Sequence, residues 1–148
     1  MNIKKIISYL IPAAIILAGG VILSIAAWFA YFGIVSAVEA IFFPLYPMRV
    51  PMTLLRFISA IFLSIAAFFI VRSKAHEYIK AIFVLGAMCM FTIATVISLY
   101  DTLAIALSII VFCDAIVIYL LIWYKKPWYY YLAIAYSIAL GLAYGWPY

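Results

Sequence analysis

Five apolar stretches separated by short polar segments constrain the fold of this chain more than any other feature. They cover residues 6–31, 52–71, 80–100, 102–124 and 128–146. A helix that crosses the hydrocarbon core of a bilayer needs about 20 mainly apolar residues. With 73% hydrophobic and 9% charged residues, the chain has too few polar side chains to cover a water-soluble domain. The pattern therefore predicts an all-α integral membrane protein, a single helical bundle of five transmembrane helices over residues 1–148.

The ends of the predicted helices follow from glycine, proline and length. Gly33 and the prolines at 44, 47 and 51 predict that the first helix ends near residue 31 and continues as a short interfacial helix and a proline-broken outer loop. The first stretch exceeds the core of a signal peptide, about 7–15 residues, so we expect an uncleaved helix. A single helix over 80–124 would be about 67 Å long, which is why a reversal is expected around Asp101.

The basic residues predict how the chain is threaded. With the N-terminus inside, the outer segments carry only Arg49 and Arg56. The inner segments carry Lys4, Lys5, Arg72, Lys74, Lys80, Lys125 and Lys126. Cytoplasmic loops of membrane proteins are enriched in Lys and Arg, so we expect a multi-pass protein of the cell membrane with a cytoplasmic N-terminus and an external C-terminus. Because the basic residues are scattered among apolar runs, nucleic acid is not an expected partner.

One short sequence occurs twice. The residues LSIAAWF at 23–29 return as LSIAAFF at 63–69, with small residues at matching places. Small residues on one helix face allow close approach of membrane helices, so we expect both faces to pack within the bundle. An inverted repeat of the transporter type and a chance similarity both remain open.

No pattern of catalytic or cofactor-binding residues is present in the sequence. Cys89 and Cys113 lie in apolar stretches without a CxxC motif, and each is expected to behave as a small buried hydrophobic residue. A soft-metal site formed by cysteine and methionine side chains is conceivable, but no loop supplies further ligands. His76 lies in a short polar loop and is expected to be solvated. We therefore expect neither a metal nor a cofactor.

Four charged residues are predicted near the outer surface: Glu39, Arg49, Arg56 and Asp101. Arg56 lies near the start of the second stretch, so its side chain should extend toward the interface and pair with Asp101 or Glu39. Such a cluster suits a structural clasp between helices, and it equally suits a binding vestibule.

Asp114 is the residue that the apolar stretches explain least. It lies near the middle of the fourth stretch, where an aspartate costs about 2.5–3.5 kcal/mol on insertion scales. The side chain is expected to face the bundle and to find hydroxyl partners at its own depth, which are Thr92, Tyr136 and Ser137. Two roles are open: a structural polar contact between helices, or a step in a proton or ion pathway.

The sequence favours a small polytopic membrane protein without catalytic activity, acting in transport or as a subunit of a larger membrane complex. The lipid bilayer is its expected partner, together with further copies of the chain or other membrane subunits. The alternative is a membrane enzyme or binding protein that acts on a lipid or a quinone at the outer surface, through Glu39, Arg56 and Asp101.

Overall fold

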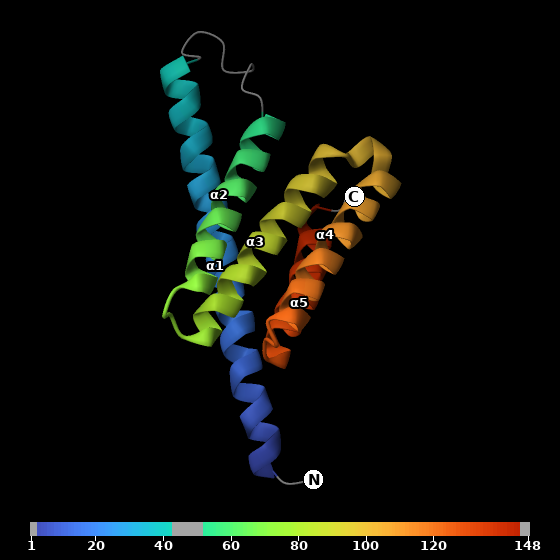
Figure 1. The fold of residues 1–148 in the computed structure, drawn as a ribbon. Helices are drawn as coiled ribbons and strands as arrows, with labels where there is room; N and C mark the ends of the chain where they lie inside the picture. The colour runs from blue at the N-terminus through green and yellow to red at the C-terminus, as the bar shows by residue number, and fades with distance from the viewer. Residues whose placement is uncertain (1–2, 43–51, 146–148) are drawn as a thin grey trace.

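The structure, a computed structural model, describes residues 3–42 and 52–145, and nearly all of these residues are helical. Each apolar stretch forms a helix because a backbone in lipid must satisfy its own hydrogen bonds. Consecutive helices run in opposite directions, and together they form the predicted all-α bundle (Figure 1). The elements are α1 (Ile3–Phe42), α2 (Met52–Arg72), α3 (Glu77–Ser98), the 3₁₀ helix η2 (Tyr100–Thr102), α4 (Leu103–Trp123) and α5 (Trp128–Gly145).

Helix α1 differs from the prediction. It continues through Gly33 to Phe42 as one helix of 40 residues, so the predicted end near residue 31 is wrong. A glycine inside a helix costs about 1 kcal/mol, less than opening backbone hydrogen bonds in an apolar environment. The prolines at 44, 47 and 51 lie outside the described residues. At about 60 Å, α1 is twice as long as a bilayer core of about 30 Å, and its N-terminal part extends beyond the other helices (Figure 1).

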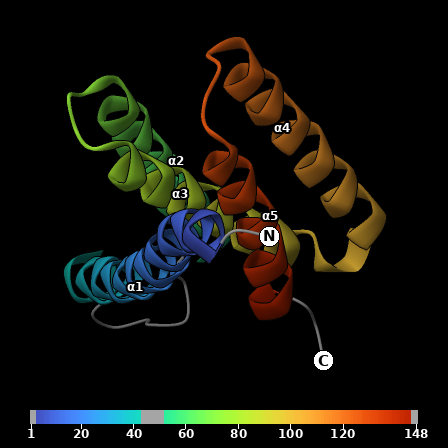
Figure 2. The ribbon, with the colours of Figure 1, turned by 90° about the horizontal axis from the view of Figure 1, so that it is seen from below.

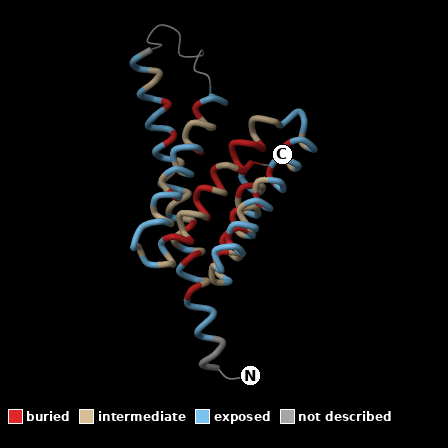
Figure 3. The backbone as a smooth tube through the Cα atoms, viewed as in Figure 1, coloured by how far each residue is buried: buried red, intermediate tan, exposed pale blue. Residues whose placement is uncertain are grey.

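Helix α3 is the centre of the bundle. Its apolar span is 61% buried, whereas the spans of α1, α2 and α4 are 17–22% buried. Figure 3 shows buried residues along most of α3 and only scattered ones on α2 and α4. It packs against α1, α2, α4 and α5, and the other helices cover it.

The two related faces at 23–29 and 63–69 pack within the bundle only in part, because Ala67 is buried whereas Ser64 is exposed. Ala27 lies against a buried cluster that Ala60 of α2 forms with Met90 and Ala94 of α3. Gly141 of α5 also allows close approach to α3, since an added Cβ there would lie 2.5 Å from the Cβ of Thr92. The small residues therefore serve helix packing, whatever the origin of the repeated sequence.

The remaining boundaries agree with the sequence to within a few residues. The predicted reversal between the third and fourth helices is confirmed, and it occurs through the short η2. In the described residues, α1 to α4 are long and apolar enough to cross a membrane. Helix α5 has 18 residues and begins with one tryptophan and three tyrosines, which lower its hydropathy. That α5 also crosses stays a prediction.

Candidate functional site

Asp114 lies in the middle of α4, 11 residues after Leu103 and nine before Trp123. By the helical rise it is about 17 Å from one end of the helix and about 14 Å from the other. Its residue exposure is only 4%. The buried positions of α4 are Ala106, Ile110, Asp114 and Leu121, which form one stripe along the helix. Asp114 therefore faces the bundle rather than lipid.

The neighbours of this stripe come from α3 and α5. One to two turns from Asp114, Val117, Ile118 and Leu121 pack against a core cluster that contains Leu85 of α3 and Ile134 of α5. Figure 2 shows α4 at the edge of the bundle, with α5 and α3 between it and α1. Helix α4 is thus held through a single face.

The predicted hydroxyl partners do not bind Asp114. Thr92 and Ser137 are fully buried, but their hydroxyl groups donate to carbonyl oxygens of their own helices, Met88 O at 2.9 Å and Ile134 O at 2.7 Å. Buried Ser and Thr side chains commonly form this bond within a helix. Tyr136 is half-buried. Among the described residues, neither carboxyl oxygen of Asp114 has a hydrogen-bond partner, and both are shielded from solvent.

The predicted outer charges do not form ion pairs in the part of the chain that the structure describes. Arg56 is half-buried and lines a small cavity of about 20 Å³ together with Trp28 and Tyr31. Among the described residues it has no salt bridge with Glu39 or Asp101, so the predicted Arg56 pairing is absent there. Asp101 is exposed in η2, and Arg49 lies outside the described residues. Within residues 3–42 and 52–145, no ion pair supports either the clasp or the vestibule.

A different charged cluster joins α3 to the turn between α4 and α5, and the sequence analysis missed it. Glu77, the first residue of α3, accepts hydrogen bonds from Lys80 Nζ at 2.8 Å, Lys126 Nζ at 3.0 Å and Tyr130 Oη at 2.7 Å. The Lys126 ammonium also lies 5.3 Å from the centre of the Tyr130 ring. The Glu77 carboxylate therefore ties together two segments that are far apart in the sequence, the start of α3 and the turn that leads into α5.

Local backbone geometry positions this cluster. His76 precedes α3, and its Nδ1 accepts a hydrogen bond from the backbone N–H of Tyr78, so His76 caps the helix rather than being merely solvated. Lys125 adopts a left-handed conformation with φ of 48°, in the turn that brings Lys126 to Glu77. The sequence shows only that Glu77 lies beside a predicted helix start. That position does not identify its partners Lys126 and Tyr130, which are 49 and 53 residues away.

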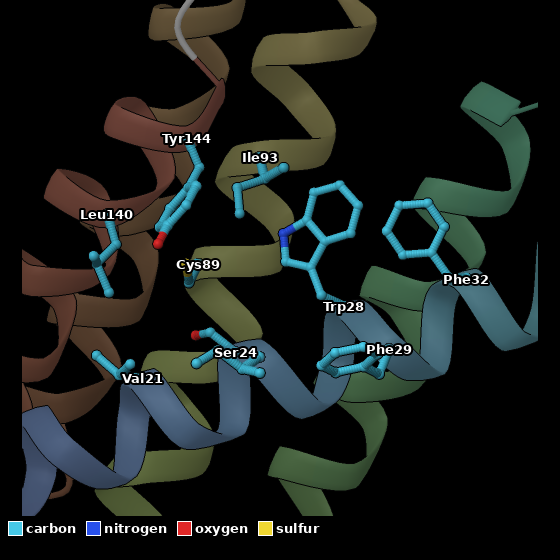
Figure 4. A pocket seen from close by; sticks show the side chains of 10 residues that line it. Val21, Ser24, Trp28, Phe29, Phe32, Cys89, Ile93, Leu140 and Tyr144 are labelled. Atoms are coloured by element: carbon cyan, nitrogen blue, oxygen red, sulfur yellow. The ribbon is translucent and has the colours of Figure 1, made fainter.

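An apolar groove runs between α1, α3 and α5, with a volume of about 420 Å³ (Figure 4). One face of α1 forms its longest wall, with Val21, Ser24, Ile25, Trp28, Phe29 and Phe32. Cys89 and Ile93 of α3 form the floor, and Leu140 and Tyr144 of α5 form the opposite wall. The volume falls within the range of about 300–1,000 Å³ found for small-molecule sites.

Few polar atoms reach this groove. The hydroxyl oxygen of Ser24 is shielded from solvent and lies in the lining together with the Cys89 thiol. Figure 4 shows the Tyr144 hydroxyl and the Trp28 indole nitrogen turned toward the space above Cys89. The groove therefore combines an apolar lining with a small number of converging donors, the usual composition of a site for an apolar ligand.

The potential metal-binding residues are dispersed. Within residues 3–42 and 52–145, no three His, Cys, Asp or Glu side chains gather in a way that would hold a metal ion. Cys89 is a buried free thiol, and Cys113 is a half-buried one.

Comparison with known proteins gives no family to which the chain belongs: no family model, no curated protein and no solved structure matches it. Any functional conclusion therefore depends on the geometry of Asp114, the Glu77 cluster and the groove.

Proposed function

We propose that this membrane protein is not an enzyme, and that it acts in transport as part of a larger membrane assembly, with Asp114 as a proton-binding group. The observation that carries the proposal is the burial of both Asp114 carboxyl oxygens without a hydrogen-bond partner in the described residues. An ionised carboxylate without a partner is very costly in an apolar interior, so in this arrangement the side chain carries a proton.

The position of Asp114 argues against two other roles. Among the described residues it forms no hydrogen bond to another helix, and the nearby Thr92 and Ser137 hydroxyls donate to their own helices. It also does not dock a partner subunit from outside, because the side chain faces α3 and α5 and is only 4% exposed. A buried acid that serves neither purpose is best explained by reversible proton binding.

The single contact face of α4 supports a role that requires movement. Release of the proton requires water or a cation to reach Asp114. Because α4 lies at the edge of the bundle and packs through one stripe, it is the helix whose displacement disrupts the fewest contacts (Figure 2). Movement of α4 thus offers a route by which Asp114 gains and loses contact with water.

The distribution of basic residues supports an N-terminus in the cytoplasm. The loop between α2 and α3 and the turn between α4 and α5 lie at the same end of the bundle as the N-terminus (Figure 1). These two connections and the adjacent helix ends carry Arg72, Lys74, Lys80, Lys125 and Lys126. By the positive-inside rule this end faces the cytoplasm.

Proton movement into vesicles that contain the assembly extracted from its native membrane, together with an internal pH-sensitive dye, tests the proposal. With a membrane potential imposed by potassium and valinomycin, the native protein should acidify the vesicles faster than empty vesicles. Asp114→Asn should abolish this activity, because an amide does not titrate, and Glu39→Gln should retain it. Equal proton movement in the Asp114→Asn protein, or none in the native protein, would contradict the proposal.

The assembly is tested separately by the mass of the protein extracted from its native membrane with the surrounding lipid. A bundle of this size has little room to enclose a pathway alone, so we expect a complex larger than one chain of 16.7 kDa. A single chain would reject this part of the proposal.

A further inference from the structure

The groove between α1, α3 and α5 has two chemically distinct halves. Along α1, the lining positions from Val21 to Phe32 span about 17 Å by the helical rise. The part nearer the C-terminal end of α1 is aromatic, formed by Trp28, Phe29 and Phe32, and Tyr144 of α5 lies across the groove from it (Figure 4). The other half is mainly aliphatic, with Val21, Ile25 and Leu140. The groove thus offers a surface for a flat ring beside a surface for a hydrocarbon chain.

The aromatic half is ordered for stacking. The rings of Trp28 and Phe32 lie 4.9 Å apart with an angle of 22° between their planes. Phe29 is 74% exposed, and its ring lies along the groove (Figure 4). Aromatic faces favour offset stacking with other flat rings.

Two hydrogen-bond donors face the groove from opposite walls (Figure 4). The Trp28 indole N–H and the Tyr144 hydroxyl form no hydrogen bond within the described part of the chain, and both point into the groove (Figure 4). An indole N–H only donates, whereas a phenolic hydroxyl donates and accepts. A ligand that fits here carries a hydrogen-bond acceptor on or near its ring.

The described lining residues of the groove carry no charge, which disfavours binding of an ionic head group. Arg56 lines a separate small cavity that also touches Trp28. A phosphate placed in the groove would lose its hydration without gaining a cation.

We infer that the groove binds a quinone, a flat ring with carbonyl oxygens attached to an apolar chain. The ring stacks on Trp28 and Phe29, a carbonyl oxygen accepts from Trp28 or Tyr144, and the chain follows the aliphatic half. This site is distinct from Asp114, and binding alone is inferred.

Equilibrium binding of radiolabelled decyl-benzoquinone to the full-length protein in lipid nanodiscs tests the inference, with empty nanodiscs giving the partition into lipid. We expect saturable binding above that partition. Decyl acetate, which carries the same chain and a carbonyl but no ring, should compete poorly. Tyr144→Phe should weaken binding about fivefold, the equivalent of one hydrogen bond, and Trp28→Phe should weaken it to a similar extent.

Matched variants on the opposite side of the bundle provide the controls. Tyr119→Phe and Trp123→Phe alter exposed aromatic residues of α4 and should leave binding unchanged. Circular dichroism and thermal unfolding of each variant establish that it is folded.

Three results would overturn the inference. Equal competition by decyl acetate would show that the groove accepts any lipid chain. Unchanged binding in both Tyr144→Phe and Trp28→Phe, or an equal loss in the control variants, would place the ligand elsewhere. Absence of saturable binding, with cross-linking between copies through a cysteine introduced at position 29, would show that a second copy covers the groove.

Discussion

Two carboxylates in this bundle have opposite surroundings. Glu77, the first residue of α3, accepts hydrogen bonds from two ammonium groups and one phenol, and its side chain is 37% exposed. Asp114, in the middle of α4, is shielded from solvent and has no partner among the described residues. Glu77 therefore contributes hydrogen bonds that stabilise the fold, whereas burial of Asp114 lowers its stability. Residues that cost stability without returning contacts are the ones for which a functional explanation is needed.

Removal of Glu77 should have the largest effect on stability. Glu77→Ala leaves Lys80, Lys126 and the fully buried Tyr130 without their common acceptor. Partial exposure of the carboxylate screens the loss, so we expect a decrease of about 2 kcal/mol in the free energy of unfolding. Reversible unfolding in mixed micelles measures it. Glu39→Ala is the control and should change the free energy of unfolding by less than about 0.5 kcal/mol. Equal effects in the two variants would show that the contacts of Glu77 do not stabilise the fold.

Replacement of Asp114 by an apolar residue should change stability in the opposite direction. Leucine branches at the same carbon as aspartate, and Asp114→Leu removes two buried oxygens that have no described partner. We expect the bundle to gain about 1.5 kcal/mol, measured by the same unfolding experiment. A loss of stability in this variant would show that Asp114 makes a structural contact, and the contrast with Glu77 would fail.

The tyrosine of the Glu77 cluster should contribute a smaller amount. Tyr130→Phe keeps the buried ring and removes only the hydroxyl that donates to Glu77 at 2.7 Å. The expected loss is about 1 kcal/mol, the contribution of one hydrogen bond. Tyr129→Phe, in the adjacent ring, tests whether the effect is specific, because no described hydrogen bond of Tyr129 is lost. An unchanged Tyr130→Phe protein would mean that the two lysines alone satisfy Glu77.

Arg56 should have the smallest effect. With no ion pair in the described residues, Arg56→Leu is expected to change the free energy of unfolding by less than about 0.5 kcal/mol. A loss of several kcal/mol would indicate a desolvated carboxylate partner and would restore the predicted outer cluster.

The sequence predicted those features that lipid alone dictates. Residues 52–71 and 102–124 became α2 and α4 almost unchanged, because an apolar run in a bilayer has no alternative to a helix. The end of α1 was predicted wrongly because Gly33 was given too much weight as a helix breaker. A single glycine costs a helix only about 1 kcal/mol, so it does not by itself end one.

The hydrogen-bond partners of the charged side chains could not be predicted from the sequence. The depth of Asp114 follows from its position in the stretch, but depth does not reveal that Thr92 and Ser137 donate to their own helices. The Glu77 cluster depends on how the α4–α5 turn meets the start of α3, which is a property of the packed bundle. The groove likewise requires three helices to be placed around it.

The protonation of Asp114 in the folded protein is the central claim, and infrared spectroscopy of the protein in lipid vesicles near neutral pH tests it most directly. Protonated carboxyl groups absorb in a region that is separate from that of ionised carboxylates. We predict such a band in the native protein and in Glu77→Gln, and its loss in Asp114→Asn. A native protein without the band, or an Asp114→Asn protein that keeps it, would contradict the account.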